Sequence, residues 1–183
     1  MNLHYETVSP LLKETLQKLV NSPIFKDFTL IGGTCLSLQL GHRRSIDIDL
    51  FTDIDYGTMN TKEMKEFIQR SFPYSENTDS LDTSALGYTL YMGDSPIDKI
   101  KVDFFYTEKF IFPIQEIDHI RIADIREIAA MKLSAITEEE PRQKDFWDIH
   151  ELNEKYSFKD MIDWGIKRNE WSVTEEGILN GFQ

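Results

Sequence analysis

Two aspartates separated by a single residue, Asp47 and Asp49, are the side chains best suited to chemistry. Apolar residues alternate with them over residues 46–50. Successive side chains of a β-strand point to opposite faces, so both carboxylates are expected on one face. Two adjacent negative charges repel each other unless a cation lies between them. The pair therefore predicts a divalent-ion site, with Mg²⁺ as the natural ion and Mn²⁺ as the alternative, because such ions prefer carboxylate, water and phosphate oxygens.

A third carboxylate, Asp103, lies in a second segment with the same alternation. In residues 99–106, apolar Val102 and Phe104 flank it and are expected on the opposite face. Three carboxylates on neighbouring strands can hold divalent ions against a triphosphate, and one of them can accept a proton from an attacking hydroxyl. The alternative is that Asp47 and Asp49 are only solvated side chains of an edge strand.

The residues that precede the aspartate pair suit a phosphate group. Gly32-Gly33-Thr34 joins a short apolar strand to a short helix, and Ser45 adds a hydroxyl just before the pair. Backbone N–H groups and the helix dipole attract anions at such a helix N-terminus. We therefore predict nucleotide contacts from these four residues, although a double glycine can equally be only a tight turn.

Lys132 falls within the apolar stripe of a helix expected over residues 124–137. A lysine in such a stripe either extends to water or meets an anion. Arg142, Asp145 and Asp148 stand at the start of the next expected helix, and the two aspartates lie one turn apart. They are predicted to orient Lys132 or Arg142 toward a phosphate. The alternative is a solvated face with weak local ion pairs.

The elements that must position these residues follow from periodicity and capping signals. Capping residues precede four of the helices: Ser9, Asn60, Asp124 and Ser157. Helices are expected over about 10–20, 34–40, 60–71, 124–137, 141–156 and 157–169, and strands over 28–31, 46–52, 85–92, 99–106 and 119–122. This order predicts an α/β core over residues 1–123, followed by a helical part over residues 124–183.

Composition excludes several classes of protein. The 183 residues include 32 acidic and 20 basic side chains, which gives a net charge of −12. Extended coating of nucleic acid needs many basic contacts to phosphate and is not expected, although a local basic patch can dock one RNA end. No apolar run approaches the ~20 residues that span a bilayer, and no secretory signal is visible. The single cysteine, Cys35, excludes an intrachain disulfide. A cytoplasmic protein with no membrane partner is the simplest expectation.

Several motifs occur together in a characteristic order: GGT, LxLxxGHRxSxDIDLF, KVDFF, an alanine-rich helix with MK and LSAI, and RxKDxxDI. Over residues 28–155 they resemble the AbiEii/AbiGii toxin-like nucleotidyltransferases, a branch of the DNA polymerase β-like superfamily. The resemblance implies an α+β fold of the minimal nucleotidyltransferase type. Such a fold has a small mixed β-sheet flanked by helices and a helical C-terminal part packed on the core.

The resemblance also implies an activity and the residues that carry it. The expected reaction moves a nucleoside monophosphate from an NTP to a hydroxyl acceptor, which is RNA (for example tRNA) or protein. By this resemblance Asp47, Asp49 and Asp103 would be Mg²⁺ ligands, and Gly32, Gly33 and Ser45 would lie near the phosphates. Lys132 and Asp145 fall on the family's Lys and Lys-Asp motifs. With Arg142 and Thr34 as nucleotide contacts, these residues form the predicted site.

The family is linked to toxin–antitoxin pairs, so an antitoxin protein is an expected partner.

Two alternatives use the same pocket. One is an NTP-dependent kinase that moves the γ-phosphate with the same metal site. The other is a non-catalytic pseudo-enzyme that binds a nucleotide or a protein partner. The chain is short for many members of the family, which leaves acceptor recognition open.

Overall fold

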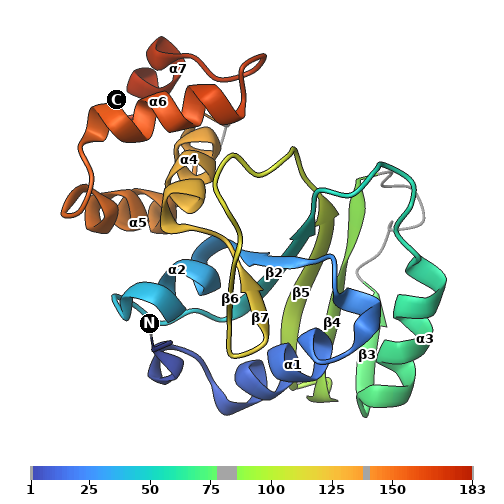
Figure 1. Cartoon of the computed structure of the whole chain (residues 1–183). Helices are drawn as coiled ribbons and strands as arrows, with labels where there is room; N and C mark the ends of the chain where they lie inside the picture. Colours follow the sequence, from blue (N-terminus) through green and yellow to red (C-terminus); the bar gives the residue numbers. More distant parts are fainter. Residues whose placement is uncertain (1, 78–85, 138–140, 183) are drawn as a thin grey trace. The chain divides into compact units, whose positions relative to one another are not determined.

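The computed structural model describes residues 2–77, 86–137 and 141–182. It contains two compact units: Met1–Glu108 with Gln115–Ile122, and Lys109–Ile114 with Ala123–Gln183. The first unit holds a seven-stranded mixed sheet with helices, and the second is helical (Figure 1). The predicted α+β class, with a mixed sheet flanked by helices and a helical C-terminal part, is therefore confirmed.

The first unit contains the elements η1 (Tyr5–Thr7), α1 (Pro10–Val20), η2 (Pro23–Phe25), β1 (Thr29–Ile31), α2 (Gly32–Leu40), β2 (Asp47–Thr52), α3 (Thr61–Ser71), β3 (Tyr74–Asn77), β4 (Gly87–Ser95), β5 (Asp98–Tyr106), β6 (Gln115–Ile117) and β7 (Ile120–Ile122). The strand order is β3-β4-β5-β2-β1-β7-β6. The pairs β2–β5 and β1–β7 are parallel, and the others are antiparallel. The second unit contains α4 (Ile125–Ile136), α5 (Gln143–Asn153), α6 (Phe158–Arg168) and α7 (Glu175–Asn180).

Helix starts follow the capping residues that the sequence predicts. The Ser9 hydroxyl accepts a hydrogen bond from the N–H of Leu12 at 3.1 Å, and the Asn60 side chain accepts one from the N–H of Glu63 at 3.2 Å. Asp124 caps α4 and Ser157 caps α6 in the same way. Each cap satisfies a backbone donor that has no partner within its helix.

Some predicted boundaries are wrong. Helix α2 begins two residues earlier than expected, at the double glycine, and β4 continues to Ser95 rather than ending at residue 92. The predicted first residue of that strand, residue 85, lies outside the described ranges. Strands β3 and β6 and helix α7 were not predicted, because they are short and mostly polar and so lack an apolar period.

The core of the first unit lies on one face of the sheet. Helix α1 contacts β2, β4, β5 and β7 (Figure 1). At the centre, the centroid of the Phe104 ring lies 5.4 Å from that of Phe25, 5.5 Å from that of Phe28 and 5.4 Å from that of Tyr88. Each large apolar side chain removed from water contributes about 1.5–3 kcal/mol. This packing buries one face of the central strands, while the other face carries the three aspartates together with the rings of Phe51 and Phe105.

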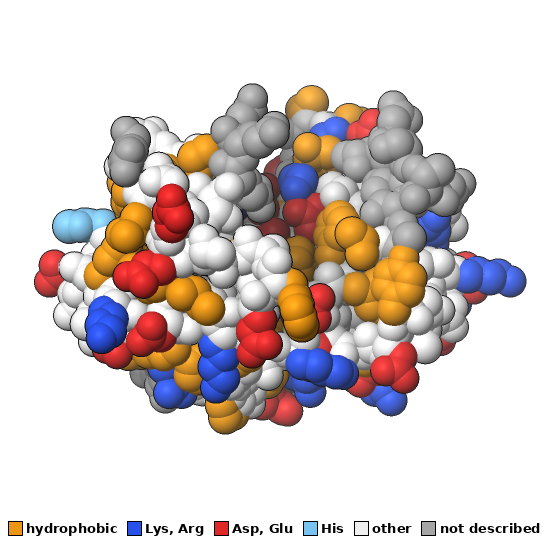
Figure 2. All heavy atoms as spheres, turned by 90° about the horizontal axis from the view of Figure 1, so that it is seen from above, with side chains coloured by type: hydrophobic (Ala, Val, Ile, Leu, Met, Phe, Trp, Pro, Cys, Tyr) orange, Lys and Arg blue, Asp and Glu red, His pale blue; other side chains and the backbone are white. Residues whose placement is uncertain are grey.

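The surface carries charges of both signs. Acidic, basic and apolar side chains are interspersed over the face drawn in Figure 2. Within the described ranges, no helix is long and apolar enough to cross a membrane. The single cysteine, Cys35, is buried in α2, as a small apolar side chain in a core usually is.

Candidate active site

Strands β2 and β5 bring the three predicted carboxylates to one face of the sheet. Asp47 and Asp49 are half-buried, while the intervening Ile48 is fully buried on the opposite face. In the parallel register of the two strands, Asp49 lies opposite Asp103 and Asp47 lies opposite Lys101. The expected alternation is thus confirmed on both strands.

Asp103 is held by two side chains that the sequence did not assign to the site. The Thr89 hydroxyl on β4 donates to Oδ1 at 2.6 Å, and Lys101 Nζ lies 2.5 Å from Oδ2. Partial burial works against the lysine's charge, but the Asp103 carboxylate, with Asp49 and Asp47, raises the pKa of Lys101 above its usual value. Lys101 is therefore a charged ammonium on the carboxylate face.

The first glycine of the turn places Asp49. Gly32 has φ +69°, a left-handed conformation that disfavours other residues. Its Cα lies so close to the Asp49 carboxylate that an added Cβ would clash with Oδ2. Helix α2 begins at Gly32 and has no side-chain cap. The Asp49 carboxylate therefore lies at the positive end of the helix dipole. The turn thus positions a predicted metal ligand as well as offering backbone N–H groups.

The second glycine, Gly33, leaves room for the side chain of Arg43. A Cβ on Gly33 would lie 2.5 Å from a terminal nitrogen of Arg43 and 3.5 Å from the Ser45 hydroxyl. The hydroxyls of Thr34 and Ser45 are both buried and 2.8 Å apart, and that of Thr34 also donates to the carbonyl of Asp47. The two hydroxyls therefore fix the start of β2. Arg43, which the sequence did not place in the site, adds a cation at the start of α2.

Lys132 meets two anions in the second unit. Its ammonium lies 2.5 Å from Asp145 Oδ1 and 2.8 Å from Asp148 Oδ2, and all three side chains are at most 5% exposed. Arg142, whose side chain is 60% exposed, donates from Nε to Asp145 Oδ2 at 2.8 Å. Burial by itself raises the pKa of Asp145, but the Lys132 ammonium and the Arg142 guanidinium outweigh it and hold that pKa below its usual value.

A second buried ion pair in this unit was not predicted. Arg168 Nε donates to Glu127 Oε1 at 2.6 Å, and both side chains are at most 5% exposed. The other oxygen of Glu127 accepts from the N–H groups of Ile111 and Phe112, at 2.9 and 3.1 Å. Glu127 thus joins α4, α6 and the segment Lys109–Ile114. All the hydrogen-bonding partners of this carboxylate lie within the unit, so its evident role is structural.

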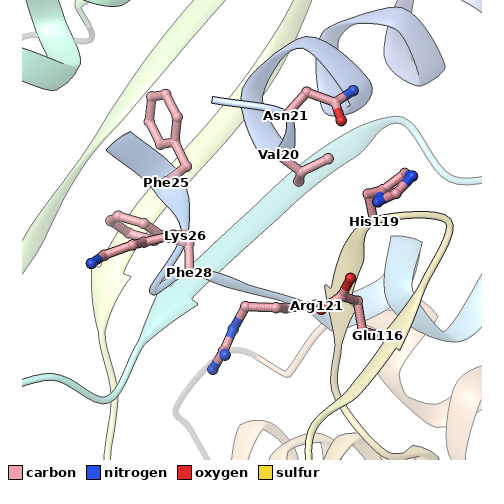
Figure 3. A pocket seen from close by; sticks show the side chains of 8 residues that line it. All are labelled: Val20, Asn21, Phe25, Lys26, Phe28, Glu116, His119 and Arg121. Carbon is pink, nitrogen blue, oxygen red and sulfur yellow. The ribbon is translucent and has the colours of Figure 1, made fainter. Parts of the chain in front are cut away.

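A separate cavity of about 300 Å³ lies in the first unit, between the end of α1, η2 and the β6–β7 hairpin (Figure 3). The rings of Phe25 and Phe28 line it together with basic side chains such as Lys26 and Arg121. Glu116 is its one carboxylate, and none of the predicted site residues lines it. This cavity is therefore distinct from the β2–β5 face that carries the three predicted carboxylates.

Two solved structures described as nucleotidyltransferase or nucleotidyltransferase-like proteins have a similar fold. The nucleotidyltransferase toxin MenT4 of Mycobacterium tuberculosis superposes with a TM-score of 0.60, at 13% identity over 90% of this chain and 64% of its own. An antigenic nucleotidyltransferase-like protein of Paracoccidioides brasiliensis gives a TM-score of 0.55, at 15% identity over 95% of this chain and 86% of its own. These likenesses show a nucleotidyltransferase fold.

Sequence comparison identifies the family. An uncharacterized protein of Aquifex aeolicus (strain VF5) is 33% identical over 173 residues, which are 90% of this chain and 73% of that protein. The family described as "Nucleotidyl transferase AbiEii toxin, Type IV TA system" matches residues 14–169. Most of the chain, including both strands with the predicted carboxylates, lies within this match. The chain therefore belongs to the AbiEii family of nucleotidyltransferase toxins.

Proposed function

We propose that this protein transfers a nucleoside monophosphate from an NTP to a hydroxyl acceptor and depends on Mg²⁺ or Mn²⁺. The observation that carries the proposal is the grouping of Asp47, Asp49 and Asp103 on one face of β2 and β5, with Asp49 against the N-terminal turn of α2. Carboxylates beside a helix N-terminus suit a substrate that carries both an anionic phosphate chain and its metal ion.

The donor set fits a hard divalent cation. All three side chains supply oxygen ligands from adjacent strands, and the ammonium of Lys101 already lies against one of them. Among the residues that the structure describes, however, no three Asp, Glu, His or Cys side chains are already gathered around one point. A bound ion would neutralise charge on the triphosphate and on the attacking oxygen.

The chain's own residues would carry the remaining steps. Arg43 and the backbone N–H groups that begin α2 at Gly32 and Gly33 would bind the phosphate chain. The acceptor oxygen forms a bond to the α-phosphorus while the bond to the bridging oxygen breaks and pyrophosphate leaves. The hydroxyl proton passes to one of the three aspartates. Such chemistry depends mainly on positioning and electrostatics.

Roles for Lys132, Asp145 and Arg142 toward the nucleotide are proposed from the motif match. The same holds for direct phosphate contacts from Thr34 and Ser45, whose side chains are buried. Membership of a toxin family supports a further proposal, that a separately encoded antitoxin counters the activity of this protein in the cytoplasm. The proposed acceptor is RNA, for example tRNA, or a protein.

A paired labelling experiment tests the reaction. The protein is incubated with Mg²⁺, total bacterial RNA and cell extract, with each NTP labelled at either the α- or the γ-phosphate. We expect macromolecular label only from α-labelled NTP, and nuclease or protease digestion then identifies the acceptor. Label only from γ-labelled NTP would replace this proposal with the kinase alternative.

The control is Asp49→Asn, which keeps the shape of the side chain and removes its charge. Removing one electrostatic contact to a transition state commonly costs about 10²–10³ in rate, and we expect at least this loss. The melting temperature should change little, because the relieved repulsion with Asp47 and Asp103 offsets the lost attraction to the N-terminus of α2. NTP binding by the wild type without any transfer would instead support a pseudo-enzyme.

A further inference from the structure

The Lys101 ammonium lies beside the three aspartates that are proposed to bind the divalent cation. It stands opposite Asp47 in the register of β2 and β5, two residues from Asp103 on the same face. Its Nζ lies 2.5 Å from Asp103 Oδ2, and its side chain is 36% exposed, against 14% for that of Asp103. The lysine therefore reaches the carboxylate face from the solvent side and keeps access to water.

Both oxygens of Asp103 face donors within the sheet. Thr89 donates to Oδ1 and Lys101 donates to Oδ2, so Asp103 is turned toward β4 and its own strand. Three carboxylates around one divalent ion require at least one oxygen of each to point to that ion. The ammonium near Oδ2 opposes this arrangement in two ways, because it occupies the oxygen and repels a second cation.

We propose that Lys101 is a resident counter-cation that competes with the divalent ion for Asp103 Oδ2, while Thr89 keeps Oδ1 in place. This inference rests on the proposed function, since it concerns the same metal site. A lysine has a flexible four-carbon stem, so its ammonium can swing into water without moving the strand.

The test is an equilibrium titration of the full chain with Mn²⁺, in which the electron paramagnetic resonance signal reports the free ion. We expect Lys101→Met to bind Mn²⁺ at least about tenfold more tightly than the wild type, because a like charge beside the ion is removed. Lys101→Arg keeps the charge and should bind like the wild type. Equal or weaker binding by Lys101→Met would overturn the proposal.

Lys99→Met is the matched control. Lys99 stands on the same strand and loses the same charge, but its ammonium pairs with Glu76 at 2.8 Å instead of with the aspartates. We expect it to change Mn²⁺ affinity by less than about twofold, since its ammonium is already paired with Glu76 and contacts none of the three aspartates. An equal gain in both variants would show a general charge effect and contradict competition at Asp103. Should Lys101→Met fail to fold by circular dichroism, Lys101→Gln takes its place.

Asp49→Asn separates the two proposals. If it leaves Mn²⁺ binding unchanged, the carboxylate metal site fails, and the counter-cation role fails with it. If it abolishes binding while Lys101→Met matches the wild type, only the role of Lys101 fails. Binding by Lys101→Met where the wild type shows none would be the strongest support for competition.

Discussion

Two clusters of charged side chains, one in each unit, differ in exposure and in charge balance. On the β2–β5 face, three aspartates stand with one lysine, and the side chains remain in contact with water. In the second unit, Lys132 lies between Asp145 and Asp148, and Arg142 adds a second cation. The lysine and both aspartates there are at most 5% exposed.

This difference in exposure and charge balance supports a ligand-binding role for the first cluster and a structural role for the second. Buried charges are tolerated only when partners compensate them, and the second cluster, with the Glu127–Arg168 pair, meets that condition from its own unit. Like charges gathered at a partly exposed face retain repulsion that an added cation can relieve. We therefore propose ion binding for the first cluster, and expect the second to stabilise its helices whatever its role toward the nucleotide.

The largest effect is expected when the second cluster loses its lysine. Lys132→Met leaves two buried carboxylates without their common cation, and breaking a buried pair in this way costs about 3–5 kcal/mol. Urea unfolding should show the loss. The control, Lys167→Met, makes the same substitution at an exposed position of α6 and should stay within about 0.5 kcal/mol. Full stability with lost transfer would contradict a structural role for Lys132 and place its ammonium at the phosphates.

Lowering the pH should reduce the stability that the second cluster contributes, because Asp145 becomes protonated. Because its pKa is lower in the folded chain than the ordinary 3.8, its contribution to stability is fully present above pH 3.8. The contribution is lost as the pH falls below that value through the folded-state pKa. Unfolding free energies measured from pH 6 downward should fall more steeply for the wild type than for Asp145→Asn. Parallel curves would mean that the ion pair adds nothing to stability.

In the first cluster, Gly32→Ala should cost about 1–3 kcal/mol, because alanine disfavours its left-handed backbone. The new Cβ also displaces the Asp49 carboxylate, so transfer and Mn²⁺ binding should both be lost. Gly33→Ala is the comparison variant, since there the Cβ meets only the flexible end of Arg43 and the Ser45 hydroxyl. It should keep stability and Mn²⁺ binding and raise KM for the NTP. Equal behaviour of the two variants would contradict separate roles for the glycines.

The smallest effect on stability is expected at the exposed edge of the second cluster. The Arg142 side chain is 60% exposed, so solvent screens its pair with Asp145, and Arg142→Gln should cost less than about 1 kcal/mol. If Arg142 contacts the nucleotide, as the sequence predicts, KM for the NTP should rise severalfold with little change in melting temperature. An unchanged KM would remove Arg142 from the site.

Local signals in the sequence predicted much of the fold. The caps at Ser9 and Asn60 mark the starts of α1 and α3, because a cap is a contact between residues two or three apart. The alternation around Asp47 and Asp49 predicted which face each side chain takes. Strands β3 and β6 escaped prediction, because edge strands bury little and need no apolar period.

The site residues also fall into those that local sequence signals predicted and those that they missed. Residue type and spacing predicted the three aspartates, the double glycine and Lys132. Paired carboxylates in a strand, two glycines before a helix and a lysine in an apolar stripe are all unusual enough to recognise in the sequence. Lys101 and Arg43 were missed as site residues. Both are common surface residues. The role of Lys101 depends on the register that brings β2, with Asp47 and Asp49, beside its own strand, and that of Arg43 depends on its approach to Gly33 at the start of α2.

The sequence by itself determined the α+β class, the faces of the two acidic strands and the family, because periodicity, caps and motifs are short-range properties of the chain. The fold, and no local signal, places Asp49 opposite Asp103, turns the Thr89 hydroxyl of β4 to Asp103, and pairs Glu127 with Arg168, 41 residues away. Strand register and buried ion pairs are set by which distant segments pack together. That packing depends on the free energy of the whole fold and leaves no local pattern in the sequence.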